Sequence, residues 1–347
     1  MGRVRVRRGR LLLVLAVVVA IVGGIGYRAL QWWDEPLAGL TAPVVIEVAS
    51  GERVGALSER LSALGVLDHP TLWAWQARLR GQAGHLRTGE YEIKAQATPR
   101  EILALVVSGK VVLHPVTLVE GWTVREVLAT LHALPFIRPR VTSASDPAIQ
   151  TSLGLAQRSL EGQLFADTYL VPKGTTDLDV LKWAHGRLTR ELATAWAGRD
   201  PQLPYTSPYE ALTLASIIEK ETGNPDERPR IAGVFVNRLR KGMRLQTDPT
   251  VIYGLGERYS GVLHKKDLQT DTPWNTYTRD GLPPTPIAVP GRAAIEAALH
   301  PAPTGDLYFV ASGKGDGRHT FSPTLAAHNA AVASYVASQR RRKDQGP

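Results

Sequence analysis

An uncharged stretch at residues 11–27 restricts the fold of this chain more than any other feature, because it is apolar apart from three glycines. Its seventeen residues would extend about 26 Å as a helix. That length is short of a hydrocarbon core of roughly 30 Å but within the range seen for transmembrane helices. Arg10 and Arg28 flank the stretch, where long basic side chains can reach the lipid headgroups. The sequence therefore predicts a transmembrane helix over residues 11–29.

The residues on either side predict its orientation. The basic tail 1–10 is expected in the cytoplasm, because positive charge is retained on that side of the membrane. Trp32 and Trp33 suit the aromatic belt at the opposite interface, within a short linker over residues 30–42. A cleaved signal peptide is the alternative, but the apolar run exceeds the usual ~7–15 residues and no clear Ala-x-Ala site follows. We expect a single-pass protein of the bacterial inner (cytoplasmic) membrane, with its C-terminal domains in the periplasm.

The charge distribution argues against a nucleic-acid-binding protein. The formal net charge is +9, and the N-terminal tail and the basic tail 340–347 carry eight of those charges, so the body is almost neutral. The chain has no cysteine, which excludes disulfides, thiolate metal sites and cysteine nucleophiles. Its nine histidines show no His-Glu-x-x-His or paired spacing. We predict no metal site and no cofactor.

The rest of the chain predicts an α+β fold, beginning with a small βααβ domain at residues 43–115. Strand-like runs at Pro43–Ala49 and Thr88–Ile93 enclose two segments with helical spacing. This arrangement resembles a degenerate LysM module, a small fold that binds glycans containing N-acetylglucosamine; a packing domain without a ligand fits the pattern equally well. An intermediate segment, 116–205, follows, and its stretch 135–159 is expected to be irregular.

A helix beginning at Ser207 has the most complete local signals in the chain. Ser207 suits the N-cap, Pro208 the first helical position, and Glu210 completes a capping box. The apolar positions of this helix form one stripe at about 100° per residue: Ala211, Leu214, Ala215, Ile217 and Ile218. Glu219 and Glu221 lie on the two flanks of the stripe, where partial desolvation raises a carboxyl pKa. Two solvated helix glutamates are the alternative.

Further elements follow before the end of the chain. A second amphipathic helix is predicted through residues 231–239, and residues 244–281 are rich in polar and aromatic side chains. Residues 307–311 and 319–321 flank a glycine-rich turn and predict a β-hairpin.

These residues together resemble the MltG-type (YceG-like) endolytic murein transglycosylases. The matching motifs are Ala215-Ser-Ile-Ile-Glu-Lys-Glu-Thr222, Val234-Phe-Val-Asn-Arg-Leu239, the run Gly242–Gly254, Asn275-Thr-Tyr277 and Gly281-Leu-Pro-Pro284. The order of parts is also similar: an anchor, a LysM-like domain, and a catalytic domain, which we place at residues 206–339. Ala166 departs from the family, which usually carries proline there before Asp-Thr.

The resemblance implies cleavage of the β-1,4 bond between N-acetylmuramic acid and N-acetylglucosamine within nascent peptidoglycan strands, leaving a 1,6-anhydro end and ending strand elongation. It assigns catalysis to Glu221, which would act first as acid and then as base. The position agrees, because a carboxylate at a helix C-terminus meets the negative end of the helix dipole. Glu219 is expected to support the site. The resemblance also suggests peptidoglycan synthases (penicillin-binding proteins) as partners.

Four polar residues are candidate sugar contacts, although ordinary turn or core duty is the alternative for each: Gln246, Asp248, Asn275 and Tyr277. Two other functions stay open. One is a muramidase-type hydrolase that uses Glu221 with an aspartate such as Asp248, and the other is a non-enzymatic, membrane-anchored peptidoglycan-binding scaffold.

Overall fold

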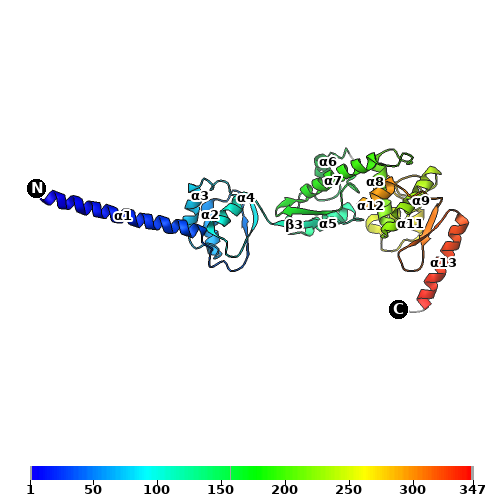
Figure 1. Cartoon of the computed structure of the whole chain (residues 1–347). Helices are drawn as coiled ribbons and strands as arrows, with labels where there is room; N and C mark the ends of the chain where they lie inside the picture. The colour runs from blue at the N-terminus through cyan, green and yellow to red at the C-terminus, as the bar shows by residue number, and fades with distance from the viewer. Residues whose placement is uncertain (1, 157, 345–347) are drawn as a thin grey trace. The chain divides into compact units, whose positions relative to one another are not determined.

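The computed structural model describes residues 2–156 and 158–344 and has a mixed α+β fold, as expected (Figure 1). The chain separates into two compact units. The first comprises the residues up to 114 together with 170–174, and the second comprises 115–169 and the residues from 175 onward. Most of the predicted intermediate segment, 116–205, therefore belongs to the same unit as the helix that begins after Ser207.

Helix α1 (Gly2–Asp34) contains an apolar span, Leu11–Asp34, long enough to cross a membrane, which is compatible with a single-pass anchor. The prediction that Trp33 joins an interfacial belt is wrong. Its side chain is 1% exposed and packs in the core of the first unit with Leu37 and Leu40. The Arg80 guanidinium also lies 4.9 Å from its ring centroid. Part of the stretch expected as a linker thus contributes to a core. The removal of these apolar side chains from water stabilises that packing.

The first unit has the predicted βααβ order. Its elements are β1 (Val44–Val48), α2 (Val54–Ala63), α3 (Pro70–Leu79), β2 (Gly89–Ile93) and α4 (Pro99–Ser108). Strands β1 and β2 pair antiparallel, with Val44 opposite Ile93 and Val48 opposite Gly89. Helix α4 begins with a capping box, because Thr98 Oγ1 accepts from the Glu101 amide and the Glu101 carboxylate accepts from the Thr98 amide.

Short strands and two helices precede a long helix in the next part of the chain. The elements in this region are β3 (Leu113–Thr117), α5 (Val124–Ala133), β4 (Ile137–Arg138), α6 (Pro147–Leu153), β5 (Thr168–Pro172), β6 (Thr175–Thr176) and α7 (Asp177–Ala197). Strands β3 and β5 span the division between the units. Helix α6 lies where the sequence predicted irregular structure. The Asp146 carboxylate accepts from the Ala148 amide at 2.9 Å, and Gly154 ends the helix in the left-handed conformation.

The C-terminal part supplies most of the helices around the candidate site. Its elements are α8 (Pro208–Glu221), the 3₁₀ turn η1 (Pro225–Glu227), α9 (Arg228–Arg240), α10 (Asp248–Leu255), η2 (Gly256–Arg258), α11 (Lys265–Gln269), α12 (Arg292–Leu299), β7 (Tyr308–Ala311), β8 (His319–Ser322) and α13 (Leu325–Asp344). The predicted hairpin is confirmed as β7 and β8, which pair antiparallel (orange in Figure 1). The sequence did not predict helices α10, α11, α12 and α13.

The middle of helix α8 is buried on all sides rather than along one stripe. Every residue from 211 to 218 is buried, and α7, α9, α10 and α12 contact the helix. Its two buried polar side chains are satisfied locally. Thr213 Oγ1 donates to the Tyr209 carbonyl at 2.9 Å, and Ser216 Oγ donates to the Thr213 carbonyl at 2.7 Å. Ser216 Oγ also accepts from the Ile287 amide at 3.0 Å, which links α8 to the chain before α12.

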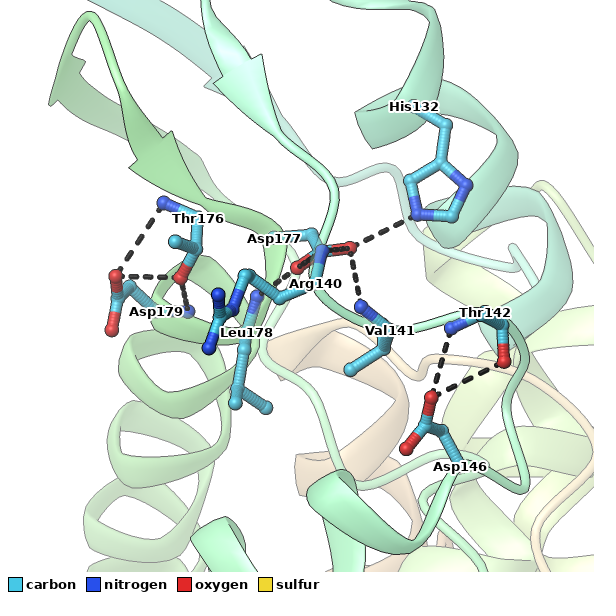
Figure 2. A network of polar contacts seen from close by, with 9 residues as sticks. All are labelled: His132, Arg140, Val141, Thr142, Asp146, Thr176, Asp177, Leu178 and Asp179. Atoms are coloured by element: carbon cyan, nitrogen blue, oxygen red, sulfur yellow. Dashed lines mark hydrogen bonds and ion pairs between the residues drawn. The ribbon is translucent and has the colours of Figure 1, made fainter.

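A buried carboxylate joins α5, α7 and the loop after β4 (Figure 2). Asp177 is 0% exposed and accepts from the amides of Arg140 and Leu178, at 2.9 and 2.7 Å, and from Val141 at 3.2 Å. His132 Nε2 lies 3.0 Å from the same carboxylate. These partners replace the hydration that Asp177 loses on burial.

Replacing Asp177 should therefore destabilise the second unit without touching the candidate site. In Asp177→Asn, an amide NH₂ replaces one carboxylate oxygen and faces donors instead of accepting from them. We expect a loss of about 2–4 kcal/mol in the free energy of unfolding, measured by denaturant unfolding. The exposed Asp226→Asn is the control and should stay within about 0.5 kcal/mol of the wild type. Equal stability of both variants would contradict this role for Asp177.

Candidate active site

Glu221 is the last residue of α8, where the chain turns away from the helix. Thr222 has an extended backbone, with φ −146° and ψ 133°, and its Oγ1 accepts from the Asn224 amide at 3.0 Å. This turn leaves the Glu221 side chain at the negative end of the helix dipole. Its Oε1 accepts a short hydrogen bond from Thr247 Oγ1.

Thr247 is held in place by a buried group of threonines that joins two segments of the chain. The Thr247 amide donates to Thr276 Oγ1 at 3.1 Å, and the hydroxyls of Thr250 and Thr276 are 2.9 Å apart. Thr250 Oγ1 donates to the Thr247 carbonyl at 2.8 Å. Because these side chains are buried and mutually bonded, Thr247 is a fixed donor to Glu221.

The surroundings of Glu221 favour its neutral form. Burial raises the pKa of Glu221 from its ordinary 4.5 to about 7, and the negative charge of Asp248 adds to that shift. The hydrogen bond from Thr247 and the positive charges of His319 and Arg238 oppose it. Arg238 is fixed, because its guanidinium donates to the carbonyls of Leu245 and Leu307, each at 2.6 Å. Glu221 can thus donate a proton near neutral pH.

A pocket of about 340 Å³ opens at Glu221. The end of α8 forms one wall, and the glycine-rich turn between β7 and β8 forms another. His319 also lines the pocket, and its Nδ1 lies 2.9 Å from Glu227 Oε2, while its amide donates to Glu227 Oε1 at 3.0 Å. Glu227 thereby orients the imidazole and leaves Nε2 as the ring nitrogen for a ligand in the pocket.

Glu219 has a different environment from Glu221, although periodicity placed both at the edge of the same stripe. Its Oε1 lies 2.9 Å from Nη2 of Arg228 in an almost fully buried ion pair. Its Oε2 accepts from the Gly291 amide at 3.0 Å. Burial raises the pKa of Glu219, whereas the Gly291 hydrogen bond and the Arg228 charge oppose the shift. Glu219 therefore fastens α8 to the starts of α9 and α12.

Of the four predicted sugar contacts, Asp248 and Tyr277 interact electrostatically with Glu221. Gln246 precedes Thr247, which donates to Glu221. Asp248 and Tyr277 are bonded, with Tyr277 Oη donating to Asp248 Oδ1 at 2.6 Å. The negative charge of Asp248 contributes to the raised pKa of Glu221. Burial raises the pKa of Tyr277, and the charge of Glu221 adds to that shift. Gln246 is exposed and has a left-handed backbone, with φ 50°, and its amide donates to the Thr276 carbonyl at 3.1 Å.

Asn275 holds the backbone of residues 268–277 in place through its side-chain amide. The residue is 0% exposed, and its Nδ2 donates to the Thr270 carbonyl at 2.7 Å and the Leu268 carbonyl at 3.1 Å. Its Oδ1 accepts from the Tyr277 amide at 2.8 Å. A side chain with these bonds has no surface left for a sugar, and it acts by positioning Tyr277.

Sequence reasoning missed two contributors to this site. Thr247 lies inside a motif noted for its resemblance, but the pattern gave no sign that its hydroxyl reaches Glu221. His319 was assigned only to a hairpin, and its pairing with Glu227 joins residues far apart in the chain. Within residues 2–156 and 158–344, no group of three or more His, Cys, Asp or Glu side chains is placed to hold a metal ion.

Known proteins resemble this chain over most of its length. Residues 46–334 match the sequence profile of the YceG-like family. The endolytic murein transglycosylase of Bacillus subtilis (strain 168) is 32% identical over 316 residues, covering 86% of this chain and 86% of that protein. The endolytic murein transglycosylase of Streptococcus pneumoniae serotype 2 is 26% identical, covering 93% of this chain and 64% of that protein. A crystal structure of a YceG-like protein from Listeria monocytogenes is 30% identical and superposes with a TM-score of 0.53, covering 84% of this chain and 99% of that one.

The raised pKa of Glu221 predicts a pH-dependent effect of its replacement on stability. Between pH 4.5 and about 7 the unfolded chain loses this proton while the folded chain keeps it, so the carboxyl group costs the wild type stability as pH rises. The melting temperature of Glu221→Gln minus that of the wild type should therefore increase from pH 5 to pH 8, as measured by calorimetry.

Glu210→Gln is the control for this measurement. Hydrogen bonds from the Thr206 and Ser207 amides lower the pKa of Glu210, so it is ionised at both pH values. Its melting-temperature difference should be the same at pH 5 and pH 8. A constant difference for Glu221→Gln would contradict the raised pKa.

Proposed function

Because the chain belongs to the YceG-like family, we propose that it is an endolytic murein transglycosylase, a lyase that cleaves the MurNAc–GlcNAc β-1,4 bond within peptidoglycan strands. One observation carries the assignment of chemistry to Glu221: a buried carboxyl group with a pKa of about 7 borders a pocket at the end of α8. Its position supports a role as the acid and base of the reaction.

The first step is proton transfer to the glycosidic oxygen. The leaving sugar needs this proton as positive charge develops at C1 of the muramic residue. Glu221 can supply it near neutral pH because burial keeps a large fraction of the carboxyl groups protonated. The hydrogen bond from Thr247 then stabilises the carboxylate that remains.

The second step returns the proton to Glu221. The Glu221 carboxylate removes the proton from the C6 hydroxyl of the same muramic residue, and the C6 oxygen attacks C1. One C–O bond breaks and another forms, so the products are a free GlcNAc hydroxyl and a 1,6-anhydro-MurNAc end. The reaction consumes no water and needs no second catalytic carboxylate.

Other groups support this site in distinct ways. Glu219 holds the last turn of α8 through Arg228 and Gly291 and does not take part in proton transfer. Asp248, held by Tyr277, favours the protonated form of Glu221. His319 is oriented by Glu227 and offers a donor or acceptor to a substrate oxygen in the pocket.

We also propose where the protein lies in the cell. The apolar helix within α1 would anchor the protein in the inner membrane, with residues 1–10 in the cytoplasm and the catalytic domain, 206–339, in the periplasm. A site tethered to the membrane suits the termination of nascent strands beside peptidoglycan synthases such as penicillin-binding proteins.

The products of the reaction test this function. Full-length protein in detergent should convert uncrosslinked glycan strands into fragments that end in 1,6-anhydro-MurNAc, each smaller by one water than a hydrolytic product, as measured by mass spectrometry. Fragments with reducing ends would instead indicate a hydrolase that uses Glu221 with Asp248. Intact strands would indicate a glycan-binding scaffold.

The two glutamates of α8 should differ when each is replaced by glutamine. Glu221→Gln removes the transferable proton and should lower kcat by about 10²–10⁴-fold while glycan binding is kept. Glu219→Gln weakens a buried ion pair and should lower the melting temperature while retaining cleavage within about tenfold. Equal loss of kcat in both variants, with equal stability, would contradict the assignment to Glu221.

A further inference from the structure

A second pocket, of about 560 Å³, is formed entirely within the second unit and does not include Glu221. It is lined by the start of α5, the loop that contains Glu161, the last turn of α8 and one side of α10. Its volume lies within the range of roughly 300–1,000 Å³ that is typical of ligand pockets. The mechanism proposed for Glu221 does not use any of these groups.

Three aromatic side chains line this pocket: Tyr253, Tyr259 and Trp274. Tyr253 and Trp274 meet edge to face, with centroids 5.5 Å apart. Their polar tips are already bonded, since Tyr253 Oη donates to Glu161 Oε2 at 3.2 Å and Trp274 Nε1 donates to Thr285 Oγ1 at 2.9 Å. The rings are thus fixed, and what they offer a ligand is their negatively polarised faces, which attract the C–H groups of a pyranose ring.

Glu161 closes one side of the pocket as a structural brace. Its side chain is 6% exposed, and Oε1 accepts from the Val124 amide at 3.0 Å while Oε2 accepts from Tyr253. Val124 is the first residue of α5, so one carboxyl group joins α5 to α10. Burial also raises the pKa of Glu161 to about 7. The brace keeps the aromatic wall at a set distance from α5.

The last turn of α8 contributes to both pockets, with Glu221 lining one and Lys220 lining the other. Lys220, which precedes Glu221 on α8, lines it and donates from Nζ to the Gly121 carbonyl at 3.1 Å, so its other ammonium hydrogens can donate to a ligand. Pro249, which follows Asp248 on α10, lines it as well. Because one helix turn and the start of α10 carry residues of both regions, a polymer bound at Glu221 is the ligand that this pocket best suits.

We infer that this pocket binds a sugar unit of the same glycan strand, next to the bond cleaved at Glu221, with the rings of Tyr259 and Trp274 against the sugar face and Lys220 donating to its oxygens. The inference rests on the proposed function, because it requires a glycan at Glu221. It adds a length requirement, since only strands that extend into the pocket gain the aromatic contact.

The test uses full-length Glu221→Gln protein in detergent, whose expected loss of kcat keeps the ligand intact during the titration, and a length series of peptidoglycan glycan oligomers. Calorimetric titration should show affinity rising with length up to the oligomer that fills the pocket. Adding Tyr259→Ala should remove about three- to tenfold of that gain through the loss of one aromatic contact. Oligomers too short to reach the pocket should bind equally to both proteins.

Two further variants separate the ring contact from general damage. Tyr259→Phe keeps the ring and should restore the affinity for long oligomers. Trp183→Ala removes an aromatic side chain that is 46% exposed on α7, outside the pocket, and should change nothing. In the otherwise wild-type enzyme, Tyr259→Ala should raise KM for long strands and leave kcat within about twofold.

The outcomes distinguish this inference from the function on which it rests. If the wild type cleaves long strands but Tyr259→Ala leaves both the length dependence and KM unchanged, the pocket does not bind the strand and the inference alone fails. If Glu221→Gln binds no oligomer and the wild type cleaves none, both fail.

Discussion

The burial of residues 211–218 of α8 is the constraint on which the second unit depends. Eight consecutive residues of this helix have no solvent-facing side, and the surrounding helices all pack against it. The core therefore ends where α8 ends, and the first carboxylates beyond it lie at the boundary between core and solvent. Both pockets of this region are lined by that last turn.

What differs between the two glutamates at this boundary is the partner that each one meets. Glu219 meets a guanidinium and an amide, so its carboxylate is committed to an ion pair. Glu221 meets one hydroxyl and a nearby aspartate, and its neighbours Arg238 and His319 are fixed elsewhere, Arg238 by backbone carbonyls and His319 by Glu227. Burial thus accompanies a brace in one case and a proton donor in the other, because only Glu219 meets a cation in direct contact.

Much of the fold was predictable because its signals are local. The capping boxes at Thr98, Thr123 and Ser207 and the βααβ order depend on residues within one or two turns of each other. Helices α6, α10 and α13 were missed since their segments lack a strong apolar period. Trp33 was placed at a membrane interface because the sequence shows that it follows an apolar helix but not that Leu37 and Leu40 bring it into a core.

For the candidate site, the sequence by itself determined that a glutamate ends a capped helix just before a break, and that a distant polar run resembles the same family. It did not determine which groups meet that glutamate. Tertiary structure decided that Thr247 contacts Glu221, that Arg228 neutralises Glu219, that Asn275 is buried, and that Glu161 braces a second pocket. The physical reason is that periodicity fixes the direction of a side chain relative to its own helix, whereas a pKa depends on desolvation and on charges brought near by other segments.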